Sequence, residues 1–127
     1  MNMPFQTNRA PSAIGPYSQA VITGNMMFVS GQIPLDPESM KIVDGGIREQ
    51  TARALENLMA VVEDADFGKK SIAKVTVFIK NMDDFGTINE IYADFMGDHR
   101  PARAVVEVAR LPKDVLIEIE CVCIRSY

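Results

Sequence analysis

Arg103 and Glu118 are the two side chains of this chain whose types and setting best suit chemistry. They lie in segments 103–110 and 115–125, which alternate residues in the manner of β-strands. An arginine on a half-buried sheet face offers a planar, permanently charged fork that fits a carboxylate. A nearby glutamate could accept a proton or orient a water molecule. The two could instead form a salt bridge at an interface, which the spacing alone favours, and both interpretations stay open.

Other catalytic and metal-binding chemistry has few residues to use. The single histidine, His99, lies in a charged stretch, 97–100, that predicts an exposed loop. Catalysis by a serine or cysteine nucleophile would need this histidine as its base. A structural zinc site requires four Cys or His ligands, whereas the chain holds only His99, Cys121 and Cys123. We therefore expect no metal site.

Length and charge limit the function classes. The 127 residues carry 13 Lys and Arg against 17 Asp and Glu, a net charge of −4, and suit one domain spanning 1–127. This acidic balance gives no reason to bind nucleic acid, which requires clustered basic side chains. We expect no signal peptide and no membrane-spanning segment, because no apolar stretch is long enough. The sequence thus predicts a cytoplasmic protein whose two cysteines stay reduced.

Hydrophobic periodicity predicts the elements that must position these side chains. Apolar spacing of the helical kind covers 47–65, and Gly24-Asn25 is typical of a tight hairpin turn. The order β-β-α-β-α-β-β predicts an α+β fold, with one mixed sheet and both helices on one face. The predicted elements are strands 17–23 and 26–31, helix 47–65, strand 72–80, a helix that begins near Asp83, and strands 103–110 and 115–125.

The last two strands, if they pair as an antiparallel hairpin, give the sheet one fully apolar face and one mixed face. Two helices can cover only one face, so the aliphatic side chains of the mixed face would stay exposed to water in a monomer. We therefore expect a partner subunit to cover that face. The residues predicted to share it are Arg103, Val105, Glu107, Ala109, Leu116, Glu118, Glu120, Val122 and Ile124.

Four blocks of the sequence resemble one known family. Residues 13–20 read AIGPYSQA, residues 30–34 read SGQIP, and residues 74–79 read KVTVFI. The fourth block, residues 100–120, reads RPARAVVEVARLPKDVLIEIE. In this order and at these spacings the blocks are similar to the RidA family (reactive intermediate deaminase A, also called YjgF).

This resemblance implies a chorismate-mutase-like α+β subunit that forms a homotrimer with sites in the clefts between subunits. Family members of this type hydrolyse enamines and imines, such as 2-iminobutanoate and 2-iminopropanoate, to 2-oxo acids and ammonia without metal or cofactor. We therefore expect an enamine/imine deaminase, a hydrolase of C=N bonds acting on small 2-imino acids. One alternative is a non-catalytic regulatory trimer that binds a small carboxylate in the same cleft. Another, which the acidic balance disfavours, is a ribonuclease or translation inhibitor.

The resemblance also implies residue roles by position. Arg103 matches the family's essential arginine, which would bind the substrate carboxylate. Glu118 matches the acidic residue thought to hold the attacking water, together with the backbone carbonyl of residue 105. Val105 stands where many relatives have cysteine, so thiol chemistry is absent there. The residues that match other cleft-lining positions are Tyr17, Ser30, Gly31 and Asn89.

Overall fold

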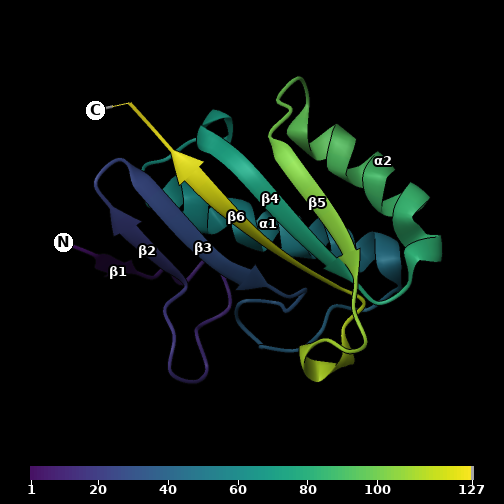
Figure 1. Ribbon diagram of the computed structural model, residues 1–127. Helices are drawn as coiled ribbons and strands as arrows, with labels where there is room; N and C mark the ends of the chain where they lie inside the picture. Colours follow the sequence, from purple (N-terminus) through teal and green to yellow (C-terminus); the bar gives the residue numbers. More distant parts are fainter. Residues whose placement is uncertain (127) are drawn as a thin grey trace.

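Six strands form one mixed sheet in residues 1–126, the part of the chain that the computed structural model describes. Their order across the sheet is β1-β2-β3-β6-β4-β5, and β4 and β5 are the pair that runs parallel. Helices α1 and α2 share one hydrophobic core with the sheet, with α1 behind it and α2 beside the β5 edge (Figure 1). The elements are β1 (Met3–Phe5), β2 (Ala20–Thr23), β3 (Met26–Gln32), α1 (Ile47–Asp64), η1 (Lys69–Ser71), β4 (Ile72–Ile79), η2 (Met82–Asp84), α2 (Phe85–Met96), β5 (Ala102–Glu107), η3 (Pro112–Asp114) and β6 (Ile117–Ile124).

Helix α1 confirms the predicted helical stripe almost to the residue. Glu49 in its first turn accepts a hydrogen bond from the Gly46 N–H at 2.8 Å, which stabilises the start of the helix. Leu55, Leu58 and Val62 on its inner side are fully buried in the core. Burial of each such side chain contributes about 1.5–3 kcal/mol, so this stripe holds the helix on the sheet. Neither α1 nor α2 is long and apolar enough to cross a membrane.

The predicted N-terminal hairpin is also confirmed, and the sheet continues one strand beyond it. β2 and β3 join at Gly24, whose φ of 59° lies in the left-handed region that glycine adopts without steric cost. The additional strand, β1, pairs antiparallel with β2. Its three residues include Pro4, and such a short segment with a proline gives no strand signal in the sequence.

The predicted pairing of the last two strands is wrong. β4 lies between them, parallel to β5 and antiparallel to β6. In this register Arg103 is the neighbour of Val75, and Val105 the neighbour of Val77. Val75 and Val77 are fully buried in the core beneath the helices. The side chains of Arg103, Val105 and Glu107 therefore lie on the helix face, opposite to the expectation.

The sheet face away from the helices mixes apolar and charged side chains and is uncovered in a single chain. β6 presents Glu118, Glu120, Val122 and Ile124 there, as expected for this strand, because its alternate residues from Ile117 to Cys123 are buried. Three large apolar side chains of this face stay 41–45% exposed. They are Phe28, Val106 and Ile124.

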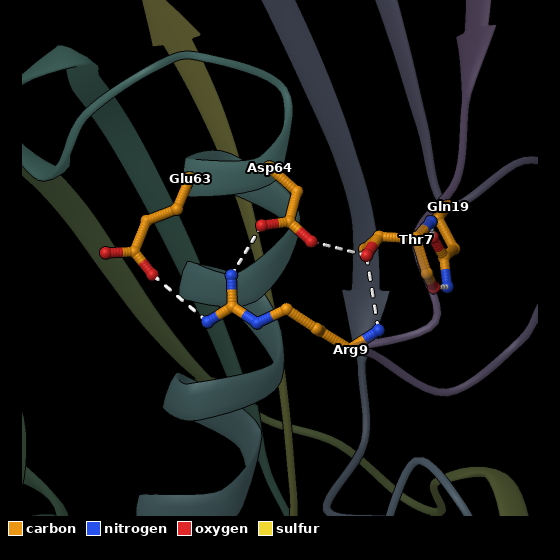
Figure 2. Close-up of polar contacts among 5 residues, drawn as sticks. All are labelled: Thr7, Arg9, Gln19, Glu63 and Asp64. Carbon is orange, nitrogen blue, oxygen red and sulfur yellow. Dashed lines mark hydrogen bonds and ion pairs between the residues drawn. The ribbon is translucent and has the colours of Figure 1, made fainter.

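The segment between β1 and β2 is fastened from two sides. Gln19 is buried, accepts a hydrogen bond from the Thr7 N–H at 2.7 Å and donates to the carbonyl of Pro11 at 2.8 Å. At the end of α1, Asp64 accepts hydrogen bonds from Thr7 Oγ1 and from Arg9 (Figure 2). These contacts, which we call the N-terminal clamp, hold residues 7–19 against the rest of the fold.

The clamp predicts an acid-sensitive contribution to stability from Asp64. Hydrogen bonds from Thr7 and Arg9 hold the pKa of Asp64 below its ordinary value of 3.8. A carboxyl whose pKa is lowered by folding stabilises the protein above its unfolded-state pKa, and this stabilisation is lost as the pH falls below 3.8. Asp64→Asn is therefore expected to lower the melting temperature at pH 7, and the difference from wild type should shrink below pH 3.8.

Glu63→Gln is the matched control for Asp64→Asn. Glu63 lies 3.4 Å from Arg9 and receives no hydrogen bond from Thr7, so a smaller change is expected. A melting-temperature difference for Asp64→Asn that persists undiminished in acid would contradict this account of the clamp.

Candidate active site

Arg103 lies in a cradle that α2 provides. Its guanidinium stacks over the Tyr92 ring, 4.7 Å from the centroid, and lies 5.7 Å from that of Phe85. Nη1 donates to Asn89 Oδ1 at 2.8 Å. Within residues 1–126 this is its one side-chain hydrogen bond, and no acidic side chain pairs with it there. Most of the five guanidinium N–H groups thus stay available for an anion.

A hollow of about 350 Å³ opens beside this guanidinium. Its lining includes Asn89, Tyr92, Arg100 and Arg103, two of which are cationic. Val105 follows Arg103 by two residues on the same face of β5 and packs against the core. The arrangement is a positively charged recess at the β5 edge, and we call Arg103, Asn89, Tyr92 and Val105 the arginine group.

Glu118 lies on the other face of the sheet. Its neighbour on β4 is Phe78, and its carboxylate extends over Gly31 of β3. A Cβ atom on Gly31 would lie 2.0 Å from Glu118 Oε2, so only glycine leaves room for the carboxylate in this position. Burial raises the pKa of Glu118, and the nearby Glu120 raises it further. The carboxylate is therefore a better proton acceptor than an exposed glutamate.

Tyr17 and Gly31 line a second hollow, of about 260 Å³, which we call the Tyr17 hollow. Tyr17 is 53% exposed. Ser30 Oγ donates to the Ser18 carbonyl at 2.6 Å, and the Ser30 N–H donates to the Gln19 carbonyl at 2.9 Å. These two hydrogen bonds from Ser30 hold the segment that carries Tyr17 against β3. Tyr17, Ser30, Gly31 and Glu118 form what we call the glutamate group.

Arg103 and Glu118 do not meet within one chain. The sequence predicted a shared face, but the sheet separates the arginine group from the glutamate group. The reason is the position of β4: the parallel pairing of Val75 with Arg103 and the antiparallel pairing of Phe78 with Glu118 set them on opposite faces. In a single chain the arginine group and the glutamate group are therefore each accessible from outside, but they do not face each other.

Tyr92 is a member of the arginine group that sequence reasoning missed. It is one of the buried residues of α2. The Arg103 guanidinium stacks on its ring. Its hydroxyl is buried without a hydrogen-bond partner in residues 1–126. Burial raises its pKa, so the phenol stays neutral. The available signal was its spacing of three residues from Asn89, which sets both on one side of the helix.

The single histidine forms a hydrogen bond, whereas the two cysteines are buried and free. His99 is half-buried rather than fully exposed as predicted, because its Nε2 lies 2.7 Å from the Ile72 carbonyl and ties the loop to β4. Cys121 and Cys123 are both buried and free. Among residues 1–126 no three His, Cys, Asp or Glu side chains are grouped so that they could hold a metal ion.

Comparison with known proteins identifies the family. The model of the family described as Endoribonuclease L-PSP, also called YjgF or RidA, matches residues 7–125. The chain belongs to this family. A RutC family protein of Pyrococcus abyssi is 51% identical over 120 residues, which cover 94% of each chain.

Two solved structures of the RidA family support the same fold. One, from Thermotoga maritima and described as a "putative endoribonuclease", has a TM-score of 0.97 at 54% identity and covers 100% of both chains. The other is Escherichia coli TdcF with bound serine, with a TM-score of 0.93 at 46% identity over 98% of this chain and 99% of that one. The sequence of TdcF, named "Putative reactive intermediate deaminase", is 47% identical over 125 residues, or 96% of each chain.

Proposed function

We propose that this protein is a deaminase that hydrolyses 2-imino acids, such as 2-iminobutanoate and 2-iminopropanoate, to 2-oxo acids and ammonia. The observation that carries the proposal is the pair of complementary groups: an arginine in an aromatic cradle, with no acidic partner among residues 1–126, and a half-buried carboxylate with a raised pKa. The name of TdcF as a reactive intermediate deaminase and its structure with bound serine, an amino acid carboxylate, support the same chemistry.

The two groups would act together across a subunit boundary. We propose a homotrimer in which the uncovered face of one chain packs beside the β5 edge of the next. Phe28, Val106 and Ile124 favour this arrangement because association would remove their exposed apolar surface from water. Glu118 of one subunit could then approach Arg103 of its neighbour, which the sheet prevents inside one chain.

The reaction needs one group that binds the substrate carboxylate, which we call the anchor, and one general base. The Arg103 guanidinium binds the substrate carboxylate through two parallel N–H···O bonds. Glu118 orients a water molecule and accepts a proton from it as the oxygen adds to the C=N carbon. The resulting carbinolamine takes that proton on nitrogen, and its C–N bond then breaks to release ammonia as Glu118 accepts the hydroxyl proton, which leaves the 2-oxo acid. An imine carbon is already electrophilic, so orientation supplies much of the acceleration.

The decisive experiment is to generate 2-iminobutanoate freshly and to measure 2-oxo acid release against the spontaneous rate. Acceleration that is independent of added metal or cofactor is expected. Binding of a small carboxylate without acceleration would favour a regulatory trimer instead. Cleavage of RNA without imine hydrolysis would favour the ribonuclease alternative. We also expect a cytoplasmic location, since the buried, reduced Cys121 and Cys123 suit a reducing compartment.

The aromatic cradle gives a separate prediction for ligand binding. Tyr92→Leu removes the ring beneath Arg103, and a cation–π contact of about 0.5–1 kcal/mol predicts a two- to fivefold higher Kd for 2-oxobutanoate. Tyr92→Phe keeps the ring and should leave the Kd unchanged. Titration calorimetry on both variants measures the effect. Equal affinities of Tyr92→Leu and wild type would exclude the cradle as a positioning device.

A further inference from the structure

The recess at the β5 edge contains a second cation that the proposed mechanism does not use. Its complete lining consists of Asn89, Tyr92, Ala93, Arg100, Pro101 and Arg103. Residues 97–101 connect the end of α2 to the start of β5, so Arg100 reaches the recess from this connection and Arg103 reaches it from β5 (Figure 1). The two guanidinium groups therefore border one hollow from successive parts of the chain.

Backbone carbonyls at the end of α2 fix the position of the Arg100 side chain. Its Nη1 donates hydrogen bonds to the carbonyls of Gly97 and His99, the latter at 3.0 Å. Within residues 1–126 these are its side-chain hydrogen bonds, so the donors on Nε and Nη2 remain for a ligand. Because the guanidinium is already held in place, an anion that binds it costs little side-chain entropy.

No acidic side chain pairs with either cation of the recess in residues 1–126. The ion pairs in this part of the chain use other arginines, namely Arg9, Arg48, Arg53 and Arg110. Burial raises the pKa of Tyr92, and the positive charges of Arg103 and Arg100 both act against that rise. Both charges thus act on one hydroxyl group, and an anion beside Tyr92 would be attracted by both.

A small 2-imino acid would use only one of the two cations. In the proposed mechanism Arg103 binds its single carboxylate, which leaves Arg100 without an anion. The other residues that line the recess are uncharged. The volume of about 350 Å³ equals the share of roughly twelve water molecules in the liquid, which is enough for a five-carbon chain. The charge and the size of the recess therefore fit a substrate with a second carboxylate at the end of its side chain.

We propose that Arg100 binds a second carboxylate of the substrate, and that the protein therefore prefers 2-imino dicarboxylates, such as the imine of glutamate, to uncharged 2-imino acids of equal length. This inference rests on the proposed function. Arg103 holds the carboxylate beside the C=N carbon, and Arg100 holds the carboxylate at the far end of the side chain. The hydrolysis itself is unchanged: water adds to the C=N carbon, and ammonia and a 2-oxo dicarboxylate are released. Arg100 thus determines specificity and takes no part in the bond-making steps.

The test compares two five-carbon imines that differ in the second carboxylate. Amino acid oxidases make the imines of glutamate and of 2-aminopentanoate in place, and 2-oxo acid release is measured against the spontaneous rate. A charge-assisted hydrogen bond that is partly exposed to solvent predicts a kcat/KM about tenfold higher for the glutamate imine, equivalent to about 1.4 kcal/mol. Because the attraction acts between charges near the surface, this preference should shrink as the salt concentration rises.

Variants of Arg100 separate its charge from other effects. Arg100→Gln should lower kcat/KM for the glutamate imine about tenfold and leave that for 2-iminopentanoate unchanged, which also shows that the variant is folded. Arg100→Lys restores the charge and should recover part of the preference. Arg48→Gln is the matched control, because Arg48 pairs with Glu90 at 3.7 Å and does not line the recess. Its preference for the glutamate imine should equal that of wild type.

The outcomes separate this inference from the proposed function. Equal kcat/KM for the two five-carbon imines in wild type would overturn the inference and leave the deaminase standing. A loss in Arg100→Gln that is the same for both imines would do so too, as would an equal loss of preference in Arg48→Gln. Failure of every imine, 2-iminobutanoate included, to be hydrolysed faster than in buffer would overturn the proposed function and this inference with it.

Discussion

Arg103→Ala is expected to lower kcat/KM for 2-iminobutanoate by roughly 100- to 10,000-fold. The guanidinium has one side-chain hydrogen bond within residues 1–126, to Asn89, and its remaining donors are available for the substrate carboxylate. Two charge-assisted hydrogen bonds of about 1.5–3 kcal/mol each would be lost with it. The anchor holds the substrate in both the ground state and the transition state, so both KM and kcat should change. Steady-state kinetics against the spontaneous rate measures the effect.

Arg103→Lys distinguishes the contribution of the positive charge to activity from that of the planar guanidinium. Lysine keeps the positive charge but cannot form two parallel bonds or lie flat over the Tyr92 ring. We expect an intermediate activity, closer to that of Arg103→Ala than to wild type. Because Arg103 is part of an edge strand and is not in the core, both variants should keep the wild-type melting temperature. Hydrolysis by Arg103→Ala at the wild-type rate would refute the anchor role.

The local elements were predictable because each leaves its own pattern in the chain. The stripe of Leu55, Leu58 and Val62 predicts α1, and Gly24-Asn25 predicts the hairpin turn. These signals depend only on neighbours in sequence. The three-residue strand β1 depends instead on its pairing with β2, so its own residues contain no pattern that predicts a strand.

Strand order and the face of β5 were not predictable in the same way. Periodicity groups Arg103 with Val105 and Glu107, but it does not say whether that group faces the helices. The apolar residues of the alternate set, Ala104 and Val106, favoured the wrong answer. β5 is an edge strand, so a long charged side chain on its helix face can still reach water past α2. The face on the other side, with exposed Phe28, Val106 and Ile124 among charged side chains, is left for a partner.

The candidate site shows the same division between local and non-local information. The resemblance singled out Arg103, Asn89 and Glu118 because it depends on short motifs, and in the structure Asn89 lies beside Arg103. It gave no account of Tyr92, whose role arises from the packing of α2 on β5. Arg103 and Glu118 are separated because β4 lies between β5 and β6 in the sheet. This strand order depends on pairing between segments that are far apart in the chain. A site divided between two faces of one sheet is most simply completed by a second copy.

Glu118→Gln is expected to lower kcat by roughly 100- to 10,000-fold, the range for loss of a general base. The amide keeps the size of the side chain over Gly31 but cannot accept the proton of water. In wild type the rate should fall in acid as Glu118 takes up a proton, and the variant should lose this dependence. The melting temperature should not fall, because a carboxyl whose pKa is raised by burial costs stability when ionised. A wild-type rate for Glu118→Gln would exclude the base role.

Mixing the two inactive variants tests whether the groups belong to different subunits. If Arg103→Ala and Glu118→Gln chains are unfolded together and reassembled at equal amounts, some interfaces combine an intact arginine from one variant with an intact glutamate from the other. Random assembly into a closed ring predicts activity at about one quarter of the sites. Chains refolded separately and then combined without exchange provide the control and should stay inactive. If each site were built within one chain, no assembly of these variants could contain an intact site, and activity would not return.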